Sequence, residues 1–223
     1  MPRPPTRGEL AAARLLERGR RGKADLSLLD MDGGPLVVKD FARKNPWFRL
    51  LGRLQIAREV RAYGKLGLIP GVPRLVGRID PYALAIEKID GVPLRYADRP
   101  HERGAAKLAD LRRIVDRIHD RGLVHWDLRS MDNVLITRAG RIAVLDFASA
   151  VWLRPGSLAH RLLFPSFRKI DESAYLKWKQ ILGGGPYSAK EITLLRRHRF
   201  WRALWVFNPR SRKAGRVEPA TDQ

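Results

Sequence analysis

The alternation of apolar and polar residues predicts strands in the first part of the chain. Short apolar runs such as PLVVKDF and YALAIE, separated by turns containing Gly, Pro and Asp, continue to about residue 91. Runs of this kind are typical of antiparallel strands joined by hairpins. Residues 53–66 interrupt them with apolar side chains at helical spacing around Glu59, which predicts one amphipathic helix among the strands.

The second part of the chain is predicted to be mainly helical. Residues 102–121 repeat Leu, Ile and Val at helical spacing and end at Gly122, a common helix stop. Ser188 is the predicted N-cap of a last helix over residues 189–207. The predicted fold class is therefore α+β.

Composition narrows the possible chemistry. The 223 residues are enough for one sizeable core or two small lobes that share a cleft. The absence of cysteine excludes disulfides and thiol catalysis, and the five scattered histidines leave a zinc site unsupported. No apolar run approaches the roughly 18 residues of a membrane span, so a cytoplasmic protein is expected.

The net charge of +21 has two readings. It would produce a positive potential over much of the surface, which favours an anionic partner such as lipid phosphates, an acidic glycolipid or nucleic acid. An arginine-rich solvated surface without a specific partner explains the same charge. Residues 42–53, ARKNPWFRLLGR, also have two interpretations. They could form a membrane-contacting insertion or a linker that packs Trp47.

The main candidate site lies in residues 123–148, LVHWDLRSMDNVLITRAGRIAVLDFA. A polar loop is followed by two strand-like runs, 134–137 and 141–145, and the second run ends at Asp146. Carboxylates and an amide are thereby expected at the open ends of a small hairpin. Such groups hold a divalent metal together with a phosphate.

This stretch resembles the protein-kinase-like superfamily. HWDLRSMDN is similar to the kinase catalytic loop, and LDFA is similar to the metal-binding DFG element with Ala148 in place of Gly. The resemblance implies that Asp127 is the catalytic base and that Asn133 and Asp146 bind metal. His125 would brace the loop.

The loop departs from the kinase pattern by one residue. Five residues, LRSMD, separate Asp127 from Asn133, where the usual pattern has four. Asp132 is therefore in strict register, and either Asp132 or Asn133 would face the metal. Asn133 is favoured, because it directly precedes the apolar run VLI as the kinase Asn does.

Lys39 and Glu59 match a second kinase feature. Lys39 lies in the strand PLVVKDF, like the lysine that reaches the nucleotide phosphates and pairs with a helical Glu. Glu59 lies in the predicted helix at the right distance. A solvent-facing lysine and an ordinary surface ion pair are the alternatives.

The remaining nucleotide contacts are weaker matches. Gly19 and Gly22 lie where a nucleotide-covering loop belongs, although a true G-x-G-x-x-G is absent and a plain hairpin fits as well. The backbone of Glu87, Lys88 and Ile89 follows a strand in the manner of the kinase hinge, which binds adenine. The same letters also end many hairpins.

The resemblance implies a two-lobed protein-kinase-like fold with a small antiparallel-sheet N-lobe and a reduced helical C-lobe. Residues 148–170 take the place of an activation segment, no APE motif is present and the remainder is short, as in RIO-type kinases and lipopolysaccharide-core sugar kinases. The expected organisation is a disordered lead at 1–8, an N-lobe at 9–91, a C-lobe at 92–207 and a disordered basic tail at 208–223.

The resemblance implies a kinase that uses ATP and Mg²⁺ and phosphorylates a hydroxyl, with an anionic glycolipid sugar such as lipopolysaccharide core as the favoured acceptor. Arg129, two residues after the base, would stabilise the transferred phosphate or would simply be solvated. The basic and aromatic helix over residues 189–207 fits either peripheral contact with the inner membrane surface or packing on the C-lobe. A RIO-like protein serine/threonine kinase and a non-catalytic nucleotide-binding scaffold are the competing readings.

Overall fold

The protein is known from a computed structural model that describes residues 3–20 and 22–204, with side chains described as far as residue 196. The chain divides into two compact units, Met1–Pro186 and Tyr187–Gln223. The second unit contributes one described helix, α4 (Ala189–Leu204).

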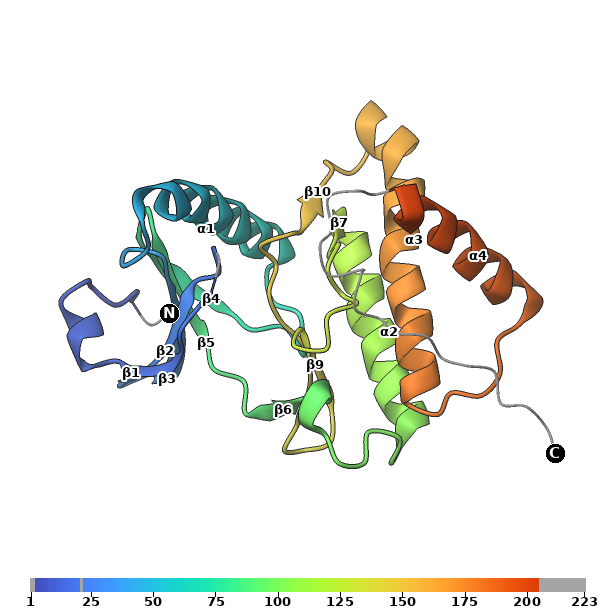
Figure 1. Cartoon of the computed structure of the whole chain (residues 1–223), viewed down its shortest axis with the longest axis horizontal. Coiled ribbons are helices and arrows are strands. Elements are labelled where there is room, and N and C mark those ends of the chain that lie inside the picture. Colours follow the sequence, from blue (N-terminus) through green and yellow to red (C-terminus); the bar gives the residue numbers. More distant parts are fainter. Residues whose placement is uncertain (1–2, 21, 205–223) are drawn as a thin grey trace. The chain divides into compact units, whose positions relative to one another are not determined.

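A five-stranded antiparallel sheet and one helix form the first part of the larger unit (Figure 1). The strand order is β1-β2-β3-β5-β4. The elements are η1 (Glu9–Ala12), β1 (Arg14–Glu17), β2 (Asp25–Met31), β3 (Gly34–Asp40), α1 (Pro46–Leu66), β4 (Leu75–Asp80) and β5 (Ala83–Glu87).

Helices and short strands form the rest of this unit. Helices α2 and α3 lie side by side (Figure 1), and the strands form a three-stranded sheet, β6-β8-β9, and the pair β7-β10. The elements are β6 (Gly91–Pro93), η2 (Leu94–Tyr96), α2 (Gly104–Asp120), β7 (Leu123–Val124), β8 (Val134–Thr137), β9 (Ile142–Val144), β10 (Val151–Trp152) and α3 (Leu158–Ile181).

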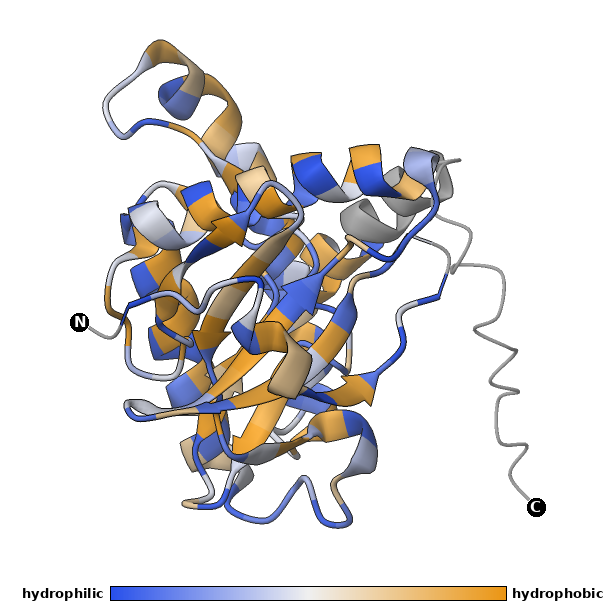
Figure 2. Ribbon diagram, turned by 90° about the vertical axis from the view of Figure 1, so that its left-hand side faces the viewer, coloured by the Kyte–Doolittle hydropathy of each residue, from blue (hydrophilic) through white to orange (hydrophobic). Residues whose placement is uncertain are grey.

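Side-chain alternation along β3 gives the five-stranded sheet two different faces. Leu36 and Val38 lie on an outer face, where a small apolar cluster forms with Leu29 and with Leu10 of η1. The opposite face, which carries Val37 and Lys39, turns toward α1 and the main core. Figure 2 shows apolar residues concentrated on the strands and polar ones in the connecting loops.

These elements confirm the predicted mixed α+β class and the antiparallel sheet. The division into two kinase-like lobes stays a prediction. No helix in the described part of the chain has the length and apolar character needed to cross a membrane.

One helix is longer than the sequence predicted, and another was not predicted at all. Helix α1 begins at Pro46 rather than residue 53, because the Asn45 side chain accepts a hydrogen bond from the Phe48 amide at 3.0 Å and Pro46 occupies the first turn. The reading of residues 42–53 as a linker that packs Trp47 was therefore wrong for most of its length, because Trp47 is 66% exposed on this helix. Membrane contact by this segment stays a prediction. Helix α3 begins at Leu158, inside the expected activation segment, with Ser157 as its N-cap.

The structure describes most of the predicted disordered lead and none of the predicted disordered tail. Of the expected lead, residues 3–8 are described, and Arg7 pairs with Asp40 and Asp80. The predicted last helix is described as α4 to Leu204. The aromatic side chains that motivated a membrane reading there, Phe200, Trp201, Trp205 and Phe207, lie outside the described side chains, as does the tail 208–223.

Candidate active site

Three charged residues from distant parts of the sequence meet on the inner side of the sheet. The Lys39 ammonium on β3 lies 2.6 Å from Glu59 Oε1 on α1 and 2.9 Å from Asp146 Oδ1 after β9. Glu59 is only 1% exposed, whereas the side chain of Asp146 remains 45% exposed. The lysine is therefore anchored by a buried carboxylate and shared with one that solvent or a ligand can reach.

The Lys39 ammonium and its two carboxylate partners stabilise each other's charges, although burial raises the pKa of Glu59 overall, with a smaller contribution from the nearby Asp146 carboxylate. Burial works to lower the pKa of Lys39, but the Glu59 and Asp146 carboxylates outweigh it and raise that pKa above its usual value. Burial likewise works to raise the pKa of Asp146, but the Lys39 ammonium lowers it overall, with help from the Ala148 amide, which donates to Asp146 Oδ1 at 3.3 Å. Lys39 and Asp146 are therefore charged at neutral pH.

Backbone geometry sets the position of Asp146. Its φ is 66°, in the left-handed region that few residues other than glycine adopt, although Asp and Asn tolerate it better than most. The preceding Leu145 amide donates to the Asn133 carbonyl at 2.8 Å. That bond ties the end of β9 to the end of the polar loop, so Asp146 and Asn133 are held in one local framework.

Asn133, rather than Asp132, lies against Asp127. The Asn133 Nδ2 donates to the Asp127 carbonyl at 2.9 Å and to Asp127 Oδ2 at 3.2 Å. Asp132 turns instead to Arg95, 2.9 Å away, and both side chains of that ion pair are about half exposed. Of the two residues that the sequence left open, the structure thus brings Asn133 into the group with Asp127.

A buried aspartate that sequence reasoning missed holds the loop in place. Asp171 on α3 is 1% exposed and accepts hydrogen bonds from the backbone amides of His125 at 2.8 Å and Trp126 at 3.0 Å. The Nε2 of His119 lies 3.0 Å from the same carboxylate. A signal did exist, since Asp171 falls at helical spacing with the buried Trp178 and interrupts an apolar stripe.

His125 braces the loop from the other side. It is fully buried, its Nε2 lies 2.9 Å from the Leu145 carbonyl, and its ring packs on Phe147 at 4.8 Å. These contacts join the polar loop to the segment that carries Asp146. The Arg129 guanidinium donates to the Ser173 carbonyl of α3 at 3.1 Å, and a role at the transferred phosphate stays a prediction.

The glycine turn between β1 and β2 is tightly built. The Gly19 amide donates to Asp25 Oδ1 at 2.8 Å, and the Lys44 ammonium donates to the Gly19 carbonyl at 2.8 Å. A Cβ at Gly19 would lie 2.2 Å from the Ala24 carbonyl oxygen, and Gly22 has a φ of 80°. Glycine at both positions is explained by the turn itself, and a phosphate-covering role stays a prediction.

Two of the three predicted hinge residues use their backbone amides for hydrogen bonds within the fold. The amide of Glu87 donates to the Arg74 carbonyl at 2.9 Å, and the amide of Lys88 donates to the Pro35 carbonyl at 3.1 Å. Among the described residues the Ile89 amide meets no acceptor. Of the three predicted hinge residues, Ile89 therefore keeps an uncommitted backbone donor, and adenine binding there stays a prediction.

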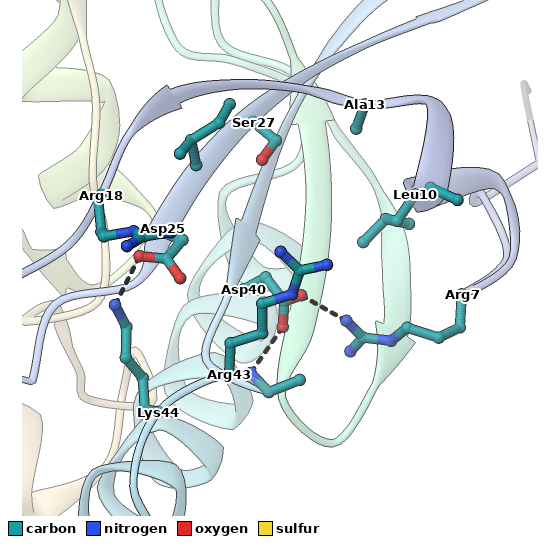
Figure 3. Close-up of a pocket in the computed structure, with 12 residues that line it drawn as sticks. Arg7, Leu10, Ala13, Arg18, Asp25, Ser27, Asp40, Arg43 and Lys44 are labelled. Carbon is teal, nitrogen blue, oxygen red and sulfur yellow. Dashed lines mark hydrogen bonds and ion pairs between the residues drawn. The ribbon is translucent and has the colours of Figure 1, made fainter.

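A cavity of about 640 Å³ lies on the outer face of the sheet and is separate from this site (Figure 3). Asp25 and Asp40, which pair across β2 and β3, line it. Asp40 directly follows the inward-facing Lys39, so its side chain lies on the opposite face of the sheet. Their carboxylates pair with Lys44 and Arg7. The cavity contains none of the carboxylates or amides expected to act on a phosphate.

Comparison with known proteins gives a local similarity that covers part of the chain. The similarity is to a protein kinase. The chain is 33% identical over 89 residues to myotonin-protein kinase of Mus musculus and, equally, of Homo sapiens. The match covers 39% of this chain but only 13% of each relative. No protein-family model matches the chain. This distant, partial similarity suggests the protein-kinase-like superfamily and nothing narrower.

Asn133 and Asp132 are expected to differ when each is replaced by Ala. Asn133→Ala removes an amide beside Asp127. It is expected to raise the Mg²⁺ concentration that gives half of the ATP-induced thermal shift by at least about tenfold. Asp132→Ala removes only an exposed ion pair, so a change below about twofold is expected. Mg²⁺ titration of the ATP-induced thermal shift measures both, and the reverse order would make Asp132 the ligand.

Proposed function

We propose that this protein is a kinase-like phosphotransferase that moves the γ-phosphate of ATP to a hydroxyl group. The observation that carries the proposal is the contact of Lys39 with both Glu59 and Asp146. An ammonium fixed by a buried carboxylate and adjoining a half-exposed one is suited to a nucleotide phosphate and its metal. The local similarity to a protein kinase supports the same chemistry.

The residues present fit ATP with Mg²⁺. Mg²⁺ is bound in proteins by one or two carboxylates plus substrate phosphates rather than by a dedicated cage. Asp146 offers its exposed carboxylate, and Asn133 offers Oδ1, because its Nδ2 is committed to Asp127. The described residues contain no cluster of three or more acidic or histidine side chains that would form such a cage. When bound, ATP and Mg²⁺ would supply the phosphoryl group and neutralise its charge.

The chain's own residues would divide the remaining work. Lys39, kept charged by its carboxylate partners, would orient the phosphates. Asp127, held by Asn133, would position the acceptor hydroxyl and accept its proton. Asp171 would act indirectly, by fixing the backbone just before Asp127.

The favoured acceptor is the sugar of an anionic glycolipid. Helix α3 begins at Leu158, soon after Asp146, so little chain lies between them to hold an extended peptide. The net charge of +21 favours an anionic acceptor. A protein serine/threonine kinase is the second candidate, since the matched relatives are named as protein kinases. A non-catalytic scaffold is less well supported, because the ionic cluster is complete.

Wild type is expected to be stabilised by ATP with Mg²⁺, and Asp146→Asn is not. ATP at about a hundred times its dissociation constant should add roughly 2.7 kcal/mol to the free energy of unfolding. For a chain of this size that raises the melting temperature by about 5–10 °C. Asp146→Asn removes the accessible negative charge, so most of the Mg²⁺-dependent shift should disappear. Thermal melts with ATP, with and without Mg²⁺, make the comparison.

Asp116→Asn is a matched control, because Asp116 is an exposed carboxylate paired with Arg112 on α2, outside this cluster and the predicted hinge. The control should keep the full shift. An absent shift in wild type, or an equal shift in Asp146→Asn, would contradict the proposed site. Transfer of label from ATP to isolated membrane or cytosolic fractions then separates glycolipid from protein acceptors.

A further inference from the structure

The solvent-facing side of helix α1 carries an apolar strip that nothing in the structure covers among the described residues. Trp47, Leu50 and Leu54 are 66%, 53% and 58% exposed, and Leu51 is 37% exposed. Their spacing of three and four residues places them along one side of the helix. We call these four residues the α1 strip. The opposite side of α1 is buried in the core and includes Ile56, Tyr63 and Leu66.

The exposed side of α1 is otherwise cationic. Arg53, Arg58 and Arg61 are exposed beside and beyond the α1 strip. The one acidic residue of the helix, Glu59, is buried and points to Lys39. The surface that α1 presents to solvent therefore combines large apolar side chains with positive charge and has no carboxylate of its own.

We propose that the α1 strip docks the protein onto an anionic lipid surface. Trp and Leu side chains enter the boundary between headgroups and acyl chains, while neighbouring arginines stay at the headgroup level and attract anionic lipids. The net charge of +21 adds long-range attraction to such a surface. The same charge opposes close approach of a second copy, so self-association through the strip is disfavoured.

This inference goes beyond the proposed function, because lipid binding needs no nucleotide and no phosphoryl transfer. It also has a structural consequence for that function. Helix α1 would bind lipid with one side and hold Glu59 against Lys39 with the other. A docked α1 would therefore keep the candidate active site close to the headgroup plane.

The test is sedimentation of the full chain, without nucleotide, with vesicles of phosphatidylcholine mixed with phosphatidylglycerol and with phosphatidylcholine vesicles alone. Wild type is expected to bind the mixed vesicles strongly and the neutral ones weakly. Leu50→Gln combined with Leu54→Gln should lower the affinity for mixed vesicles at least about tenfold. Arg53→Gln combined with Arg58→Gln should lower it roughly 25-fold, because each arginine near such a surface contributes about fivefold.

Helix α3 supplies the matched control. Leu158 and Leu162 are 70% and 66% exposed, so Leu158→Gln combined with Leu162→Gln makes the same chemical change on another helix. Binding within about twofold of wild type is expected for this control. An equal loss in the control, unchanged binding of both α1 variants, or no binding of wild type to mixed vesicles would overturn the proposal.

Loss of self-association instead of vesicle binding in the α1 variants, measured by light scattering, would also overturn the proposal, in favour of a second copy as the occupant. The thermal shift with ATP and Mg²⁺ is measured on the same variants and should be kept, since the substituted side chains are exposed. The shift and the vesicle binding can each fail alone, so failure of the phosphotransferase proposal and failure of the docking surface are distinguishable.

Discussion

Asp127→Asn is expected to lower phosphoryl transfer by roughly 10²- to 10⁴-fold while leaving ATP affinity nearly unchanged. The size of the effect is that of losing a positioned general base. The amide that replaces the carboxylate keeps its shape but cannot accept the proton of the acceptor hydroxyl. Nucleotide affinity should persist, because Lys39 and Asp146 remain in contact with each other. Label transfer from ATP measures the first quantity, and the ATP-induced thermal shift measures the second.

Asp120→Asn is the control for this substitution, since Asp120 is an exposed carboxylate at the end of α2. It should transfer phosphate at the wild-type rate. If Asp127→Asn also transferred at that rate, Asp127 would not be the base and the assignment of the polar loop would have to be abandoned.

Lys39→Met should behave differently from Asp127→Asn. Removing the ammonium leaves the buried Glu59 without its partner and deprives the phosphates of a positive charge, so both ATP affinity and transfer should fall. The pair of variants therefore separates a residue that binds the nucleotide from one that acts on the acceptor. Equal losses of ATP affinity and of transfer in the two variants would contradict that distinction.

Contacts that follow from local spacing could be predicted from the sequence. The turn at Asp32-Gly33 fixes the register of β2 and β3, and that register puts Lys39 on the inner face of the sheet. Glu59 follows Lys39 by 20 residues in a helix with one apolar side. A charged residue on that apolar side has to be paired, and Lys39 is the partner that the fold supplies.

Other features required tertiary information. Asn45, Pro46 and the helical spacing of the apolar residues after them signalled the first turns of α1, but only the fold shows that these apolar residues are exposed. Helix α3 contains Pro165, which usually ends or kinks a helix, and the helix nevertheless continues to Ile181. The choice between Asp132 and Asn133 depended on a loop conformation that one extra residue makes unpredictable from spacing.

Asp171 is the clearest case of a residue whose contacts only the fold reveals. It lies 46 residues beyond His125, and its bonds to the polar loop form only when α3 packs beside α2 and β7. Asp171→Ala is expected to lower the free energy of unfolding by about 3–5 kcal/mol, because two buried backbone amides and His119 lose their acceptor together. Urea denaturation with a fixed slope gives the value from the shift of the midpoint.

Asp116→Ala is the appropriate comparison for that loss. Asp116 also lies in a helix and pairs with Arg112, but its side chain is 51% exposed, so a cost under about 1 kcal/mol is expected. Asp171→Asn keeps one acceptor oxygen and should be intermediate, with faster hydrogen exchange at the His125 and Trp126 amides than in wild type. Because the same amides precede Asp127 directly, the folded fraction of Asp171→Asn should also transfer phosphate more slowly. Stability of Asp171→Ala equal to that of Asp116→Ala would mean that the bonds of Asp171 do not hold the loop.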